Sequence, residues 1–145
     1  MTIRQVEQSD YGQWHRMRLS LWPTATQPED ERDMREYLES EVKTAFVAQA
    51  ADGRLVAFVE ANIRHYAEGC ATRNVGYIEG WYVDEEYRRQ GIGAALVKAA
   101  EDWARSRGCQ EMASDCLMDN DVSLAAHLAL GYEEKERLIH FVKEL

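Results

Sequence analysis

The 145-residue sequence has few of the residues that interrupt regular structure, with only 2 prolines and 9 glycines. It has no tract rich in Pro, Gly or Ser, no low-complexity stretch and no internal repeat. These absences argue against separate domains joined by a linker, so one soluble globular domain covering residues 1–145 is expected. A chain of this length buries roughly 68–70% of its unfolded surface, so it can form a core without a disulfide or a structural metal.

Long apolar runs are also lacking. The uninterrupted apolar stretches are a few residues long, whereas a membrane-spanning helix needs roughly 20. Residues 1–6 do not resemble the apolar core of a secretory signal. We therefore expect no membrane partner and a cytoplasmic location.

Cysteine and histidine are scarce and poorly spaced for metal binding. The three cysteines are an odd number without a CxxC pair, and the four histidines show no HxxxH spacing. The residues concerned are Cys70, Cys109, Cys116, His15, His65, His127 and His140. Neither a disulfide nor a metal site is expected.

Positive charge is in deficit: 17 Lys and Arg against 26 Asp and Glu give a net charge of −9. Such an acidic body repels phosphate backbones and anionic membrane surfaces. Nucleic acid is therefore not expected as a partner, whereas a polycation is.

Hydrophobic periodicity and turn signals predict the order β-α-α-β-β-β-α-β-α-β. Asp52-Gly53 predicts a hairpin between two of the strands, and Gly80 predicts a bulge or a close approach within another. The order predicts one α/β domain of two or three layers. The expected strands are 2–6, 45–50, 55–63, 75–83, 110–114 and 137–142, and the expected helices are 11–21, 29–42, 92–107 and 121–130.

The segment 83–96 runs from a strand through a basic, glycine-containing loop into a helix. Gly91 and Gly93 let backbone N–H groups face one point at the positive end of the helix dipole, an arrangement typical of pyrophosphate binding. Leu96 does not fit a dinucleotide fingerprint, and the Gly-Lys-Ser/Thr of a P-loop is missing. The alternative is a glycine-containing helix start without a ligand.

The motif Arg88-x-x-Gly91-x-Gly93 resembles the loop of the GNAT N-acetyltransferase superfamily, and residues 126–132 resemble its late helix and following strand. The resemblance implies a mixed, largely antiparallel sheet flanked by helices. It also implies acetyl-CoA as co-substrate, without a metal, its pyrophosphate held by the loop and its pantetheine arm by the preceding strand. The coenzyme residues that the resemblance implies are Trp81, Tyr82, Val83, Arg88, Arg89, Gln90, Gly91, Ile92, Gly93, Ala94, Asn120 and His127.

Over nearly its whole length the chain further resembles the aminoglycoside 6′-N-acetyltransferases of this superfamily, bacterial antibiotic-resistance enzymes. The matching pieces are Leu21-Trp22-Pro23, 61–66, Gly69-Cys70, Ile78-Glu79-Gly80, 111–115, 129–132 and Glu136. The resemblance implies acetyl transfer to the 6′-amino group of a cationic aminoglycoside by a homodimer. The substrate-lining residues that it implies are Trp22, Tyr66, Glu79, Asp115 and Glu136.

Two of these carboxylates are expected to be catalytic. Asp115 follows a short apolar strand, where open α/β folds place ligands, although Asp is also common in turns and N-caps. Glu79 lies in an otherwise apolar strand, so it needs a cationic partner, either the substrate amine or an internal arginine. We expect Asp115 to remove a proton from the amine and Glu79 to orient it.

The other residues have strong structural alternatives. Trp22 is an aromatic that by default belongs to the core, whereas Tyr66 lies in an expected loop, where it can stack on a sugar ring. Glu136 belongs to an acidic run that is otherwise typical of a solvated surface. His127 stands where many relatives have the tyrosine that protonates the leaving thiolate, so it is either the general acid or a packed or capping residue. Cys116 is interpreted as structural.

Two other functions fit the same motifs. One is acetyl transfer to another amine, such as a polyamine or a protein N-terminus, and the other is an acyl-CoA-binding module without catalysis.

Overall fold

The computed structural model describes residues 1–145, apart from the side chain of Gln27. A five-stranded sheet has the order β1-β2-β3-β4-β5, antiparallel from β1 to β4 and parallel between β4 and β5. The strands are β1 (Thr2–Gln5), β2 (Lys43–Gln49), β3 (Leu55–Arg64), β4 (Val75–Val83) and β5 (Met112–Ser114). The helices are α1 (Tyr11–Leu21), α2 (Gln27–Glu39), α3 (Ile92–Ser106) and α4 (Asp121–Ala129), with short 3-10 helices η1 (Gln8–Asp10) and η2 (Glu85–Tyr87).

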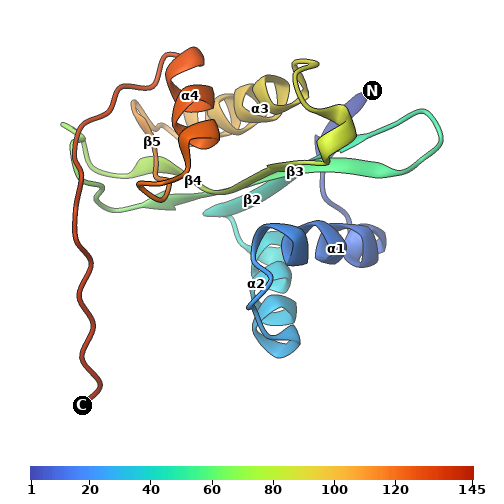
Figure 1. Ribbon diagram of the computed structural model, residues 1–145, viewed down its shortest axis with the longest axis horizontal. Coiled ribbons are helices and arrows are strands. Elements are labelled where there is room, and N and C mark those ends of the chain that lie inside the picture. The colour runs from blue at the N-terminus through green and yellow to red at the C-terminus, as the bar shows by residue number, and fades with distance from the viewer.

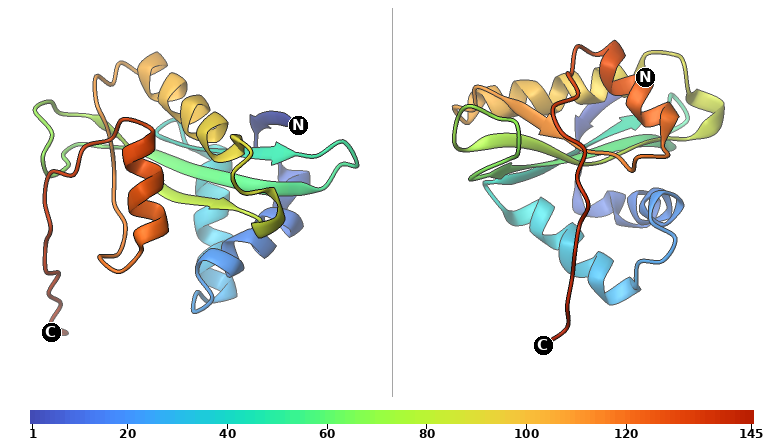
Figure 2. Two further views of the ribbon diagram at one scale, coloured as in Figure 1. Left: turned by 45° about the horizontal axis from the view of Figure 1, so that its top comes forward. Right: turned by 60° about the vertical axis from the view of Figure 1, so that its left-hand side comes forward.

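Helices cover both faces of the sheet. Figure 1 shows α3 and α4 on one face and α1 and α2 on the other, and the right-hand view of Figure 2 agrees. On the α3 face, Leu96 and Ala100 pack with Val59 of β3, and on the other face Trp14 and Met34 pack with Phe58. The expected mixed, largely antiparallel sheet between helices is confirmed. None of the helices in the described part of the chain is long and apolar enough to cross a membrane.

A β-bulge in β4 breaks the alternation of its side chains. Gly80 lies opposite Glu60, but Ile78 lies opposite the next residue of β3, Ala61, so Glu79 is an extra residue in β4. A bulged strand bends and redirects its side chains. The glycine signal in the sequence therefore marks a bulge, and Glu79 sits at its apex.

The parallel strands β4 and β5 separate after Ile78. β5 pairs with Gly76–Ile78 only, while β4 continues to Val83. From Glu79 to Val83 the outer edge of β4 therefore has no strand beside it in the described structure. Unpaired backbone groups at such an edge can bind an extended ligand.

The predicted strand 137–142 does not form, so the final β of the expected order is wrong for the isolated chain. Residues 133–145 are extended and leave the body of the protein, as the red segment of Figures 1 and 2 shows. An apolar pattern makes a strand only where backbone partners are available, and this segment has turned away from the sheet. Its large apolar side chains are exposed: Leu138, Ile139, Phe141 and Val142.

Other element boundaries differ by a few residues. α2 begins at Gln27, with Pro28 in its first turn, where the missing N–H costs no hydrogen bond. It ends at Glu39 instead of residue 42 because the backbone of Ser40 is extended. β5 has three residues instead of the expected five.

Candidate active site

The basic-glycine loop forms an uncapped helix start. Gly91 is the N-cap of α3 with φ +81°, a left-handed conformation that favours glycine, and none of the described side chains caps this helix. A helix leaves its first N–H groups without intrahelical partners, so those of residues 92–94 are available to a ligand. A Cβ on Gly91 would have no neighbour within 4 Å, so the space before it is open. These features fit the pyrophosphate of a coenzyme.

Trp81 connects this loop to α4. A Cβ on Gly93 would lie 3.1 Å from the Trp81 indole, so a side chain there would push the ring away from the helix start by a few tenths of an ångström. The other side of the ring meets the imidazole of His127 edge-on, with centroids 5.3 Å apart. Trp81 therefore lies between the loop and α4.

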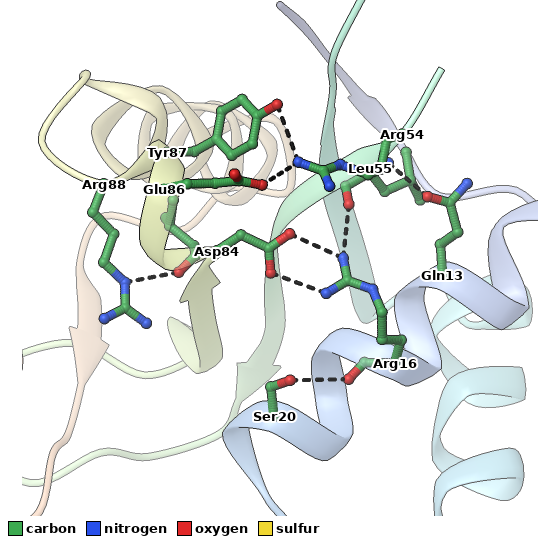
Figure 3. Close-up of polar contacts among 10 residues, drawn as sticks. Gln13, Arg16, Ser20, Arg54, Leu55, Asp84, Glu86, Tyr87 and Arg88 are labelled. Atoms are coloured by element: carbon green, nitrogen blue, oxygen red, sulfur yellow. Dashed lines mark hydrogen bonds and ion pairs between the residues drawn. The ribbon is translucent and has the colours of Figure 1, made fainter. Parts of the chain in front are cut away.

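A charged cluster anchors the segment that leads into the loop, as Figure 3 shows. Arg16 of α1 donates to both carboxylate oxygens of Asp84 at 3.0 Å and to the carbonyl of Leu55 at 2.9 Å. Arg54 binds Glu86, and it donates to the Tyr87 hydroxyl at 3.2 Å. Arg16, Arg54, Asp84 and Glu86 line a hollow of about 450 Å³ together with Glu85, but these four charges are already paired as Arg16–Asp84 and Arg54–Glu86. We infer that this charged cluster holds the basic-glycine loop in place.

The arginines of the motif differ in their contacts. Arg88 donates from Nε to the carbonyl of Val83 at 2.8 Å, which joins the loop to the end of β4. Arg89 is exposed and adopts φ +61°, a conformation that is uncommon for a residue with a side chain.

An acidic cavity of about 300 Å³ lies on the other face of the sheet, between β4, α1 and α2. Five of its lining residues are acidic and one is an arginine, which favours a cationic ligand. The lining residues are Arg18, Trp22, Ala25, Glu29, Asp30, Asp33, Tyr37, Glu60 and Glu79.

Trp22 belongs both to the cavity and to the adjacent core. It ends α1 and meets Phe58 edge-on, with centroids 6.3 Å apart. The guanidinium of Arg18 lies 5.0 Å from its ring centroid. Trp22 therefore packs against the core, as expected by default for an aromatic, and also lines the cavity.

Glu60 is a buried carboxylate that the sequence interpretation missed. It is 1% exposed and accepts hydrogen bonds from Arg18 and from Trp14 Nε1, the latter at 3.0 Å. Burial raises the pKa of Glu60 to about 7, although both hydrogen bonds act against this shift. The sequence did carry a signal for a buried carboxylate, because Glu60 interrupts an apolar strand just as Glu79 does.

Glu79 has an internal cationic partner, Arg64. The guanidinium donates from Nε to Glu79 Oε1 at 2.8 Å and from Nη2 to Oε2 at 2.9 Å. The side chain of Glu79 is still 23% exposed and lines the cavity. Glu79 therefore has the internal arginine partner that the sequence analysis gave as an alternative, and it still lines the cavity.

Asp115 follows β5 and accepts a hydrogen bond at Oδ2 from the hydroxyl of Tyr77 in β4. Asp115, Tyr66 and Glu136 do not line the cavity of the isolated chain. Tyr66 is half exposed beside Arg73, and Glu136 lies in the exposed segment 133–145.

Asn120 and His127 make structural contacts at the start of α4 and between α4 and β5. Asn120 Oδ1 accepts from the backbone N–H of Ser123 at 3.0 Å and so caps the helix. His127 Nδ1 lies 2.7 Å from the Ser123 carbonyl and Nε2 lies 2.7 Å from Ser114 Oγ. Because a carbonyl only accepts, His127 carries a proton on Nδ1. His127 therefore packs beside Trp81, with both ring nitrogens in contact with the protein, as one of the two interpretations of the sequence expected.

Comparison with known proteins decides the family. A sequence profile described as Acetyltransferase (GNAT) family matches residues 13–132. The chain belongs to the GNAT acetyltransferase family. It is 46% identical to an aminoglycoside N(6′)-acetyltransferase type 1 of Klebsiella aerogenes, over 99% of this chain and 96% of the relative.

Solved structures agree with this assignment. The fold matches AAC(6′)-Iy in complex with the bisubstrate analogue CoA-S-monomethyl-acetylneamine, with a TM-score of 0.95, 36% identity, and 99% and 98% of the two chains covered. It also matches AAC(6′)-Iy in complex with CoA, with a TM-score of 0.90, 34% identity, and 99% and 100% covered. The GNAT fold expected from the sequence is confirmed.

Proposed function

We propose that this protein transfers the acetyl group of acetyl-CoA to the 6′-amino group of aminoglycosides and so gives resistance to these antibiotics. The observation that carries the proposal is the acidic cavity at the bulge of β4. Aminoglycosides have several ammonium groups, which need carboxylates at fixed positions. The named relatives and their bound ligands support the same substrate class.

The chemistry needs a neutral amine and a group that takes its proton. The amine nitrogen attacks the thioester carbonyl, a C–N bond forms, and the C–S bond breaks as the sulfur takes up a proton. We assign removal of the amine proton to Asp115, directly or through water, and orientation of the amine to Glu79. A backbone N–H of residues 81–83 faces the oxyanion, and Trp22 contacts a sugar ring inside the cavity. We assign Tyr66 and Glu136, which lie outside the cavity of the isolated chain, to the rings and ammonium groups that extend beyond it.

We assign acetyl-CoA to the loop and to the free edge of β4, with Asn120 and His127 on the α4 side. The open space before Gly91 and the uncapped start of α3 support this placement. We expect the reaction in the cytoplasm, where acetyl-CoA is made.

We also propose a homodimer in which a second copy covers the exposed segment 133–145. The exposed fractions of Ile139, Phe141 and Val142 are 77%, 84% and 83%. Apolar side chains grouped in this way are typical of protein interfaces. Light scattering should give a dimer for the wild type and a monomer for Phe141→Asp, with Lys143→Gln as the control; a wild-type monomer at micromolar concentration rejects the dimer.

A thiol-release assay over a panel of amines tests the function. Aminoglycosides with a 6′-amine should be preferred over polyamines and peptide N-termini, and Asp115→Asn should lower turnover by about 10²–10⁴ while acetyl-CoA still binds. Preference for another amine supports a different acetyltransferase, and coenzyme binding without turnover on any amine supports a non-catalytic module.

Binding measurements test the carboxylates. Glu79→Gln and Glu136→Gln should each weaken aminoglycoside binding by on the order of 1–3 kcal/mol, with acetyl-CoA binding nearly unchanged. Glu39→Gln, an exposed acid at the end of α2, is the control. Equal losses in all three variants reject a local carboxylate site.

A further inference from the structure

Glu79 and Asp115 come from different strands, but a chain of side-chain contacts joins them. Arg64 holds Glu79 through two hydrogen bonds at 2.8 and 2.9 Å. The guanidinium carbon of Arg64 lies 3.5 Å from the ring centroid of Tyr77. The hydroxyl of Tyr77 in turn donates to Asp115 Oδ2. Two side chains, Arg64 and Tyr77, thus connect the two carboxylates.

The sheet register explains this arrangement. Arg64 pairs with Val75, and Tyr77 pairs with Asn62, so Arg64 and Tyr77 are diagonal neighbours across β3 and β4. Glu79 follows Tyr77 by two residues, and Arg64 contacts both side chains, so they lie on the same side of β4 in spite of the bulge. The parallel pairing of Tyr77 with Ala113 brings the end of β5, and with it Asp115, to the Tyr77 hydroxyl.

Each contact restricts the next side chain. A guanidinium that binds a carboxylate with two hydrogen bonds and also stacks on an aromatic ring has little rotational freedom. Tyr77 is 6% exposed, and its burial, with the hydrogen bond to Asp115, raises the pKa of the phenol well above its ordinary value. The phenol therefore stays a hydrogen-bond donor throughout the working pH range, and Asp115 Oδ1 receives no hydrogen bond from the described residues.

We propose that Arg64 and Tyr77 are positioning residues that hold Glu79 and Asp115 at a fixed separation for the acceptor amine. Tyr77 holds one oxygen of Asp115 and leaves the other for the proton of the amine. Arg64 fixes the carboxylate plane of Glu79, so the amine meets a preformed site. This inference rests on the proposed function, because it takes the two carboxylates as the groups that act on the amine.

Tyr77→Phe tests the first half of the chain, because it removes the hydroxyl and keeps the ring beneath Arg64. The turnover number should fall on the order of ten- to a hundredfold, with the KM for acetyl-CoA unchanged. Tyr11→Phe in α1 is the control for loss of a phenol hydroxyl elsewhere.

A double-mutant cycle shows whether Tyr77 acts through Asp115. The double variant Tyr77→Phe/Asp115→Asn should turn over no more slowly than Asp115→Asn alone, whereas losses that multiply overturn the inference. Normal turnover by Asp115→Asn rejects the base of the proposed function together with the role of Tyr77. A disabled Asp115→Asn beside a normal Tyr77→Phe rejects the present inference alone.

Arg64→Lys tests the second half, because lysine keeps the charge but loses the planar pair of donors. The KM for the aminoglycoside should rise about tenfold in the wild-type background and stay constant in the Glu79→Gln background. Arg105→Lys, on the α3 surface beside Asp102, is the control. An equal rise in both backgrounds overturns the role of Arg64.

Discussion

The indole ring of Trp22 occupies the space in which a side chain on Gly80 would begin. Trp22 ends α1 and Gly80 lies at the bulge of β4, so the contact joins the two walls of the acidic cavity. The Trp22 ring can lie this close to β4 because Gly80 has no Cβ.

Gly80→Ala should therefore displace Trp22 and lower aminoglycoside affinity on the order of tenfold, the result of overpacking by one methyl group. Isothermal titration with an aminoglycoside measures this loss. Gly12→Ala in α1 is a matched control, because a Cβ there meets nothing within 4 Å and alanine favours a helix. Equal affinity in the two variants contradicts the role of the Trp22–Gly80 contact.

Gly91→Val should weaken acetyl-CoA binding at least about tenfold, because the side chain is strained at φ +81° and fills the space assigned to the pyrophosphate. Gly93→Val should do the same by displacing Trp81. Gly108→Val is the control for Gly91→Val: it follows α3 with φ +87° and an equally open Cβ position. If this control loses as much acetyl-CoA affinity as Gly91→Val, strain alone explains the effect.

Asp84→Asn should raise the KM for acetyl-CoA by up to about fivefold, since it weakens the Arg16 contact that anchors the loop. The KM for the aminoglycoside should not change, because Asp84 lies outside the acidic cavity. Steady-state kinetics with each substrate varied in turn separates the two effects. Asp102→Asn, which removes an ion-paired carboxylate of α3, should alter neither KM.

The raised pKa of Glu60 predicts that the free energy of unfolding depends on pH. Between its ordinary pKa of 4.5 and its folded value of about 7, the folded protein binds more protons at Glu60 than the unfolded chain does. The contribution of Glu60 to the free energy of unfolding is therefore greatest in acid and falls as the pH rises, by up to about 3 kcal/mol.

Urea unfolding at several pH values measures this slope. Glu60→Gln should flatten the curve between pH 5 and 8 because an amide does not ionise, whereas Glu39→Gln should leave it unchanged. A Glu60→Gln curve parallel to that of the wild type contradicts the assignment.

The glycine loop and the start of α3 could be predicted because their determinants are contiguous. Gly91, Gly93 and the apolar stripe of α3 lie within one stretch of chain, where local backbone preference and helix periodicity decide the structure. The bulge at Gly80 was also signalled locally, because a glycine in an apolar strand marks a departure from regular pairing.

Other features depended on which segments meet. The sequence shows a lone carboxylate at Glu79, but the register of β3 against β4 supplies Arg64 as its partner. Residues 137–142 have the apolar content of a strand, yet a strand also needs a neighbour, and in the isolated chain this segment has none.

The sequence by itself thus determined the helix start at Gly91, the order of elements up to α4 and the acidic character of the protein. Only the tertiary structure decided which carboxylates are buried, which cations they meet and which aromatic ring covers Gly80. The physical reason is that φ/ψ preference and amphipathic periodicity act over a few neighbouring residues, whereas hydrogen bonds such as that between Tyr77 and Asp115 join residues far apart in the chain.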